Sequence, residues 1–165
     1  MTRTESIEKL RELIKGMRTC MMTTIDEEGS PHSRPMATQE AAKDGTLSFL
    51  TSKGSRTARE IAQEQIVNLS YADDGAARYV SITGRATLRS DRAKIHELWS
   101  PLFAAWWPAG KDDPDIALLE VSIDRAEYWD SPAGKVVQLL GIVKAALTGR
   151  EQQRSEREHG EVDLH

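Results

Sequence analysis

Short β-favouring segments separated by Asp and Gly turns constrain this chain more than any other feature. The first two, residues 19–25 and 31–38, flank the turn sequence Asp26-Glu27-Glu28-Gly29. Turns of this composition join antiparallel neighbours. The pattern recurs at residues 46–51, 66–72, 78–88, 118–123 and 125–129. The spacing predicts six or seven short antiparallel strands that close into a barrel of Greek-key type.

Three other segments have the apolar spacing of a helix. At the N-terminus, apolar residues recur every three or four positions: Ile7, Leu10, Leu13, Ile14 and Met17. Residues 57–65 follow, where Thr57 and Glu60 have the spacing of a capping box. Residues 91–102 are the third predicted helix. We therefore expect a mostly β protein with peripheral helices.

The length of 165 residues suits one domain, which we place at residues 1–149. Within it, residues 136–148 are predicted to form a C-terminal helix that is too apolar for a lone surface helix and too short to span a bilayer. This helix packs either against its own chain or against a second copy. Residues 150–165 are polar, and we expect them to be disordered.

Composition excludes several functional classes. The net charge of −4 and the absence of a basic run predict no nucleic-acid partner. The lack of a long apolar span predicts no membrane association, and the lone Cys20 favours a cytoplasmic protein without disulfides. Cys20 lies in an apolar strand, where we expect a small buried side chain rather than a nucleophile. The histidines lack metal-ligand spacing, so no metal site is predicted.

The first segment whose residue types suggest a chemical role is Ser33-Arg34-Pro35-Met36. Proline has no ladder donor, so Pro35 places this strand at a sheet edge or bulge. Alternation puts His32, Arg34 and Met36 on one face. The Arg34 guanidinium there can hydrogen-bond an electron-rich ring and favour the anionic reduced form of a flavin. The alternative is a surface ion pair beside an edge-strand proline.

The second segment whose residue types suggest a chemical role is Thr51-Ser52-Lys53-Gly54-Ser55-Arg56-Thr57. It joins the end of a predicted strand to the start of a predicted helix. The unpaired N–H groups and the dipole at a helix N-terminus favour an anion. Ser55 or Thr57 can donate to a phosphate, and Arg56 can hold two of its oxygens. The alternative is an ordinary helix cap in a solvated turn.

Six short motifs are spread through the chain: Thr23-Thr24-Ile25-Asp26, Ser33-Arg34-Pro35-Met36, Val67-Asn68-Leu69-Ser70-Tyr71, Tyr79-Val80-Ser81, Trp106-Trp107-Pro108 and Glu127-Tyr128-Trp129-Asp130. In this order they make the chain resemble the pyridoxamine phosphate oxidase-like FMN-binding split barrels, and among them the general stress proteins. The resemblance covers roughly residues 7–148.

The resemblance implies a homodimer with FMN sites at the interface, with FAD as an alternative cofactor. The strand of Arg34, Pro35 and Met36 would lie along the flavin ring, with Tyr79 and Trp129 also at the flavin. The phosphate end would be held by the segment that follows the third strand, through Thr51, Ser52, Ser55, Arg56 and Thr57. Pyridoxamine phosphate oxidases usually carry lysine where this chain has Thr57, which adds no charge.

A second departure concerns the reaction. In true pyridoxamine phosphate oxidases an Arg-Leu-His segment grips the substrate phosphate, but here Trp129 is followed by Asp130-Ser131-Pro132-Ala133-Gly134-Lys135. We therefore expect no oxidation of vitamin B6 phosphates.

Two classes of function stay open, with the catalytic residues unassigned. One is FMN-dependent redox transfer in a general stress response, with an unidentified small-molecule substrate or electron donor. The other is a non-catalytic flavin reservoir, sensor or partner-binding dimer. The pair Trp106-Trp107 is expected to pack in the core or an interface, or to contact a ligand.

Overall fold

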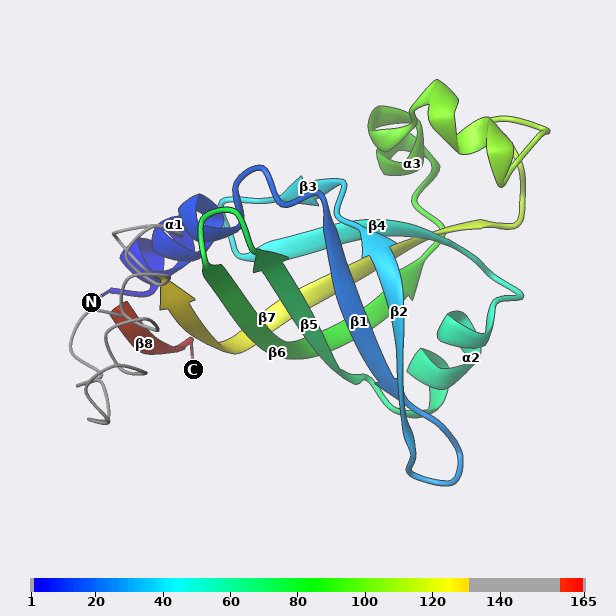
Figure 1. Cartoon of the computed structure of the whole chain (residues 1–165). Coiled ribbons are helices and arrows are strands. Elements are labelled where there is room, and N and C mark those ends of the chain that lie inside the picture. The colour runs from blue at the N-terminus through cyan, green and yellow to red at the C-terminus, as the bar shows by residue number, and fades with distance from the viewer. Residues whose placement is uncertain (1, 131–157, 165) are drawn as a thin grey trace.

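The strands form one curled antiparallel sheet in the computed structural model, which describes residues 2–130 and 158–164 (Figure 1). Their order is β2-β1-β5-β6-β7-β4-β3, with β8 also paired to β7. This arrangement confirms the predicted split barrel with peripheral helices, although the described sheet has eight strands where six or seven were predicted. The strands are β1 (Thr19–Ile25), β2 (Pro31–Ala37), β3 (Glu40–Ala41), β4 (Thr46–Ser52), β5 (Ile66–Asp73), β6 (Arg78–Arg89), β7 (Ile116–Asp130) and β8 (Glu158–Asp163).

The helices lie around the sheet. Within residues 2–130 and 158–164, every helix falls short of the length and apolar character that a bilayer-spanning helix needs. They are α1 (Arg3–Ile14), α2 (Arg56–Gln63), α3 (Arg92–Leu98) and the 3-10 helix η1 (Pro101–Ala105). Helix α1 begins at a capping box between Thr2 and Glu5. It ends just before Gly16, which has a φ of +85°. The predicted helix at 91–102 is instead two pieces, because the α-helix ends at Leu98 and Pro101 begins a new one.

Strand β2 lies at one end of the sheet, as Pro35 predicts. The two strands predicted at 118–123 and 125–129 are a single strand, β7. Its partner β6 changes register between Thr83 and Gly84, and Asp124 is the extra residue on β7. The bulge bends the strand without ending it. Only glycine fits opposite, since a Cβ on Gly84 would lie 2.4 Å from the Ser122 carbonyl oxygen.

The expectation of disorder for residues 150–165 is wrong for residues 158–163, which form β8. Strand β4 pairs with β7 only as far as Ser122, so the later part of β7 has an unpaired edge. Residues 158–163 fill that edge opposite Arg125 to Asp130, and Val162 and Leu164 are buried. A polar segment is ordered here by ladder hydrogen bonds and two apolar anchors. The predicted helix at 136–148 lies outside the described residues.

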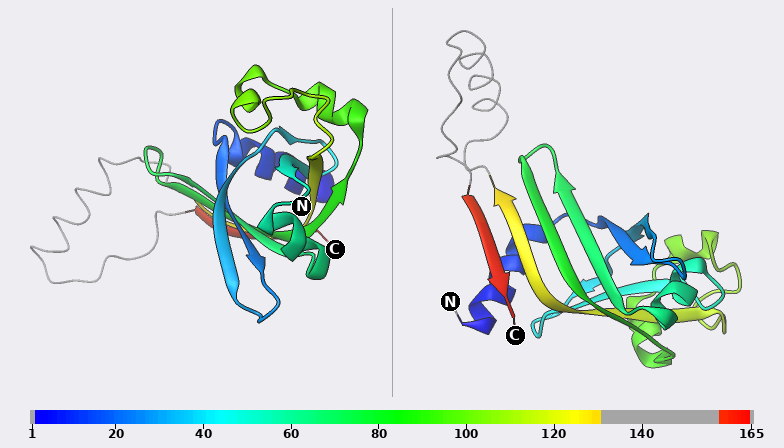
Figure 2. Two further views of the ribbon diagram at one scale, coloured as in Figure 1. Left: turned by 90° about the vertical axis from the view of Figure 1, so that its right-hand side faces the viewer. Right: turned by 90° about the horizontal axis from the view of Figure 1, so that it is seen from below.

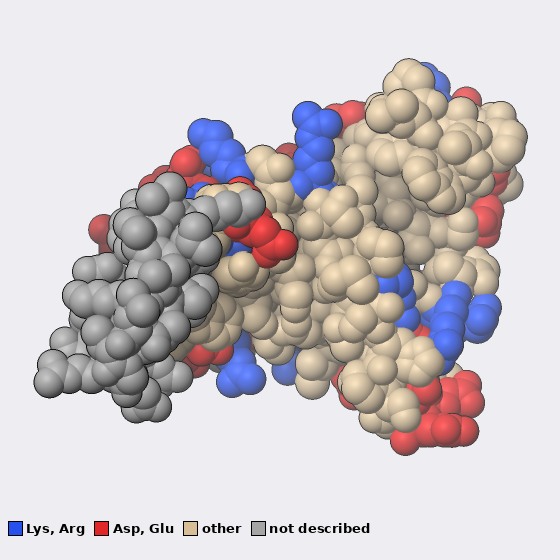
Figure 3. Space-filling view, in the orientation of Figure 1, with Lys and Arg blue, Asp and Glu red and all other residues tan. Residues whose placement is uncertain are grey.

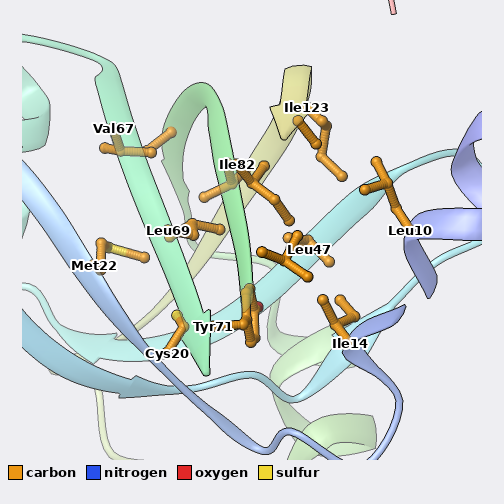
Figure 4. Close-up of a cluster of buried hydrophobic side chains, with 14 of the residues drawn as sticks. Leu10, Ile14, Cys20, Met22, Leu47, Val67, Leu69, Tyr71, Ile82 and Ile123 are labelled. Atoms are coloured by element: carbon orange, nitrogen blue, oxygen red, sulfur yellow. The ribbon is translucent and has the colours of Figure 1, made fainter. Parts of the chain in front are cut away.

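Two hydrophobic clusters lie on opposite faces of β4, whose central residues are buried on both sides. The larger fills the concave side of the sheet, where Leu10 and Ile14 of α1 face Leu69, Ile82 and other strand residues (Figure 4). Figure 2 shows α1 against this side of the curled sheet. The smaller cluster joins β4 and β7 to α3 and η1, which project beyond the barrel.

Candidate functional site

Arg34 points inward from edge strand β2, on the same side as His32 and Met36, as the alternation predicts. Its Nη2 donates to Glu60 Oε2 at 2.9 Å, and its Nη1 donates to the Thr24 hydroxyl. The guanidinium is therefore held by the β1 strand and the α2 helix. Arg34 does form an ion pair, as the alternative held, but the pair with Glu60 is largely buried and does not lie at the surface.

Glu60 is the centre of this network and is only 5% exposed. Its Oε1 accepts from Arg56 Nε at 2.6 Å, while its Oε2 accepts from Arg34 and from the Thr24 hydroxyl. Burial alone would raise the pKa of Glu60, but hydrogen bonds from Thr24, Arg56 and Arg34 outweigh it and lower the pKa to about 2. Glu60 is ionised at any physiological pH.

Arg56 lies at the surface, with 53% of its side chain exposed. Its Nη2 is 2.9 Å from His32 Nε2 and 3.7 Å from Asp26 Oδ2. A hollow of about 270 Å³ beside it is lined by Asp26, Glu27, Glu28 and other residues. Figure 3 shows these acidic side chains gathered at the tip of the β1–β2 hairpin. The charge of Arg56 is therefore shared with carboxylates already in place.

The loop between β4 and α2 places its hydroxyls close together. Thr51 Oγ1 lies 3.1 Å from Ser55 Oγ, which caps α2 by accepting from the backbone N–H of Ala58. The predicted capping box of Thr57 and Glu60 is wrong: the N-cap is Ser55, two residues before Thr57, and the arginines draw the Glu60 side chain away from the helix start. Thr57 itself is buried.

The aromatic pair of the sequence divides between two roles. Trp107 is buried in the smaller cluster, and its Nε1 donates to Ser52 Oγ at 3.1 Å. Trp106 is 71% exposed. The expected packing role is thus confirmed for Trp107, whereas Trp106 leaves a large aromatic surface open to solvent.

Tyr79 and Trp129 are neighbours across β6 and β7, but they lie away from Arg34. The intervening strands β1 and β5 separate Tyr79 from β2. The Tyr79 hydroxyl donates to Asp74 at 2.9 Å, and Trp129 stacks on His159 with ring centroids 5.3 Å apart. One chain therefore does not bring these two residues to the network of Arg34 and Arg56.

The convex face of β2, β1, β5 and β6 carries few charges. Met21, Ile66 and Tyr79 are exposed on it, with small polar side chains between them. Asn68 Nδ2 donates to Ser81 Oγ at 2.9 Å within this face. The space-filling view shows an uncharged centre with charged residues around its margin (Figure 3). Pro35 also lies on this face, on the opposite side of β2 from Arg34.

Cys20 is buried, as predicted, and burial raises the pKa of its thiol to about 11. It is therefore protonated and unreactive at neutral pH. Over residues 2–130 and 158–164, no group of three or more His, Cys, Asp and Glu side chains is arranged to hold a metal.

Sequence reasoning missed Glu60 and Thr24 as partners of Arg34. One signal was available, because Arg56 and Glu60 are four residues apart and so share a face of α2. The meeting of α2 with β2 had no local signal, since 26 positions separate Glu60 from Arg34.

Comparison with known proteins gives consistent results. Residues 5–153 match the family described as Pyridoxamine 5'-phosphate oxidase like. General stress protein 26 of Bacillus subtilis is 30% identical over 118 residues, covering 69% of this chain and 81% of that protein.

Solved structures agree with this result. A putative general stress protein 26 from Jannaschia sp. CCS1 is 26% identical with a TM-score of 0.73, covering 96% of this chain and 98% of that one. The general stress FMN/FAD binding protein of Xanthomonas citri is 34% identical with a TM-score of 0.64, covering 76% of this chain and 89% of that one. The chain belongs to the pyridoxamine 5'-phosphate oxidase-like family, in its general stress protein branch.

Proposed function

We propose that the protein binds FMN as a homodimer, with the phosphate end at the β4–α2 loop and the flavin ring along β2. The main support for this proposal is that the Glu60 carboxylate accepts hydrogen bonds both from Arg34 of β2 and from Arg56 at the start of α2. Two segments predicted for the two ends of a flavin are thereby linked. The description of the Xanthomonas citri neighbour as FMN/FAD binding supports the same cofactor class.

The loop residues fit a phosphate chemically. Arg56 is half-exposed, and within the described ranges its Nη1 has no hydrogen-bond partner. Lys53 is exposed beside Gly54, where even an added Cβ would meet nothing within 4 Å. The Thr51 and Ser55 hydroxyls lie at the same helix start. A dianionic group can therefore draw on two cations, two hydroxyls and the α2 N-terminus.

The convex face supports the dimer part of the proposal. A surface over four strands that carries few charges, with Met21, Ile66 and Tyr79 exposed, is suited to burial against a second copy. A site completed by a second copy also accounts for the separation of Tyr79 and Trp129 from Arg34 in one chain. Tyr79 and Trp129 would then contact the flavin from the partner subunit. FAD is the alternative to FMN as the bound flavin.

The protein's own groups favour electron or hydride transfer over acid–base catalysis. A bound flavin supplies the redox chemistry, and the chain binds and orients it. Glu60 is not a proton carrier at neutral pH, because its pKa is about 2. This observation also suits the second candidate, a flavin-holding protein without turnover in a stress response. Reduction of the bound flavin by NAD(P)H separates the two candidates.

Fluorescence titration of the apoprotein with FMN, FAD and riboflavin, together with light scattering, tests the proposal. We expect a dimer that binds FMN more tightly than riboflavin, because only FMN carries the phosphate. A monomer, or equal affinity for the two ligands, would contradict the dimer or the phosphate loop respectively. Failure to bind any flavin would reject the proposed function.

Replacing Arg56 with alanine is expected to weaken FMN binding by about 1.5 kcal/mol, roughly a tenfold rise in Kd, through loss of a charged hydrogen bond. The expected loss of binding free energy is no larger because the Arg56 guanidinium is already paired with Glu60 and Asp26. Riboflavin affinity should not change. Arg18→Ala, a change at an exposed arginine outside the loop, is the control. An unaltered FMN Kd in Arg56→Ala would remove Arg56 from the site.

A further inference from the structure

One buried carboxylate connects three elements of the proposed site. Glu60 belongs to α2, Thr24 to β1 and Arg34 to β2, and all three side chains meet at Glu60 Oε2. The other oxygen, Oε1, accepts from Arg56 one helical turn earlier. Both oxygens of Glu60 are therefore engaged, and each contact is a charged or buried hydrogen bond.

These contacts matter because, among residues 2–130 and 158–164, β2 has a sheet neighbour on one side only. It pairs with β1 along its length and ends the strand order of the described sheet. Helix α2 is short, and it follows β4 in the chain rather than β2. The Arg34–Glu60 pair is thus a direct tie between the strand proposed for the flavin ring and the helix whose start is proposed for the phosphate.

The Glu60 side chain also has a defined reach. Arg56 Nε and Arg34 Nη2 lie 2.6 and 2.9 Å from its two oxygens. Aspartate at this position keeps the charge but is shorter by one methylene, so it cannot hold both arginines without moving the helix or the strand. The Glu60→Asp substitution therefore separates the effect of the carboxylate charge from the effect of the side-chain length.

We propose that Glu60 is a positioning residue for flavin, because it sets the placement of α2 relative to β2. One ligand can then reach both β2, the strand proposed for the flavin ring (the ring strand), and the β4–α2 loop proposed for the phosphate (the phosphate loop). The inference rests on the proposed function. It concerns ligands that use both ends, as FMN does. A ligand that lacks the phosphate, such as riboflavin, uses the ring strand alone and gains little from this placement.

The test compares Glu60→Asp with Glu64→Asp, the same chemical change at an exposed position one turn further along the chain. Both proteins are titrated with FMN and riboflavin at a temperature where circular dichroism shows them folded. Glu60→Asp should raise the Kd for FMN about tenfold and that for riboflavin less than twofold. Glu64→Asp should leave both values unchanged. An equal loss for both ligands would reveal a merely structural role and overturn the proposal, as would an unaltered FMN Kd.

A second measurement needs no flavin. The Arg56 Nε–H should exchange with solvent at least tenfold more slowly than the Nε–H of Arg59, followed by ¹⁵N NMR, and Glu60→Asp should remove most of this difference. Equal exchange at Arg56 and Arg59 in the wild-type protein would overturn the arrangement itself. If exchange is slow but the wild-type protein binds no flavin, the proposed function fails. If it binds FMN and the ratio of affinities does not respond to Glu60→Asp, only the positioning role fails.

Discussion

Glu60→Gln is expected to lower the free energy of unfolding by about 2–3 kcal/mol. Removing one member of a buried ion pair leaves its partners without compensation, at a cost of about 3–5 kcal/mol for full burial. Arg34 is largely buried, but Arg56 is half-exposed and can turn towards water, so the effect should fall below that range. Chemical denaturation at neutral pH measures it.

Glu64→Gln provides the matched control on the same stretch of chain. Glu64 is exposed, and its carboxylate accepts only from the backbone N–H of Ile66 among the described residues. We expect a change within about 0.5 kcal/mol. Equal destabilisation by the two substitutions would contradict a special role for the buried network.

Strand positions could be predicted from the sequence where local chemistry decides them. Strand β1 occupies the predicted residues 19–25, and the edge position of β2 followed from Pro35. These features depend on turn composition and on the missing N–H of proline, which act over a few residues. Family membership was predicted because its motifs are spread through the chain, and it is confirmed.

Features that depend on distant partners could not be predicted in this way. Strand β8 exists because β7 extends beyond the end of β4, which the polar composition of residues 158–163 does not indicate. The side chain of Glu60 was assigned to a local cap, whereas tertiary contact with Arg34 determines where it points. Buried charges follow their partners, and the partners come from elsewhere in the chain.

The predicted flavin residues show the same division. Arg34 and Arg56 meet at Glu60, but Tyr79 and Trp129 lie on β6 and β7 with contacts of their own. No pattern in one chain distinguishes a site shared between two copies from a site that is absent. The oligomeric state is therefore part of the function test and not a separate question.

The stability of the protein is expected to fall in acid by about 2 kcal/mol through Glu60 alone. Its pKa is about 2 in the folded protein, against an ordinary value of 4.5. The unfolded state therefore binds more protons between these values, and stability rises with pH there. The contribution is fully present above about pH 4.5 and is lost as the pH falls through about 2. Solvent at the adjoining hollow reduces it below the full value of the shift.

Denaturation of the wild-type protein and Glu60→Gln across pH 2 to 7 isolates this contribution. Asp44 and Glu5 also have lowered pKa values, owing to hydrogen bonds with the backbone of Thr46 and Thr2, so the wild-type curve alone reports several groups. Both proteins share those groups, and the difference between their curves belongs to Glu60. That difference should be constant from pH 7 to about 5 and shrink steadily towards pH 2, because protonation removes the charge that glutamine already lacks. A difference that persists unchanged at pH 2 would mean that the shape of the side chain, and not its charge, holds Arg34 and Arg56 in place.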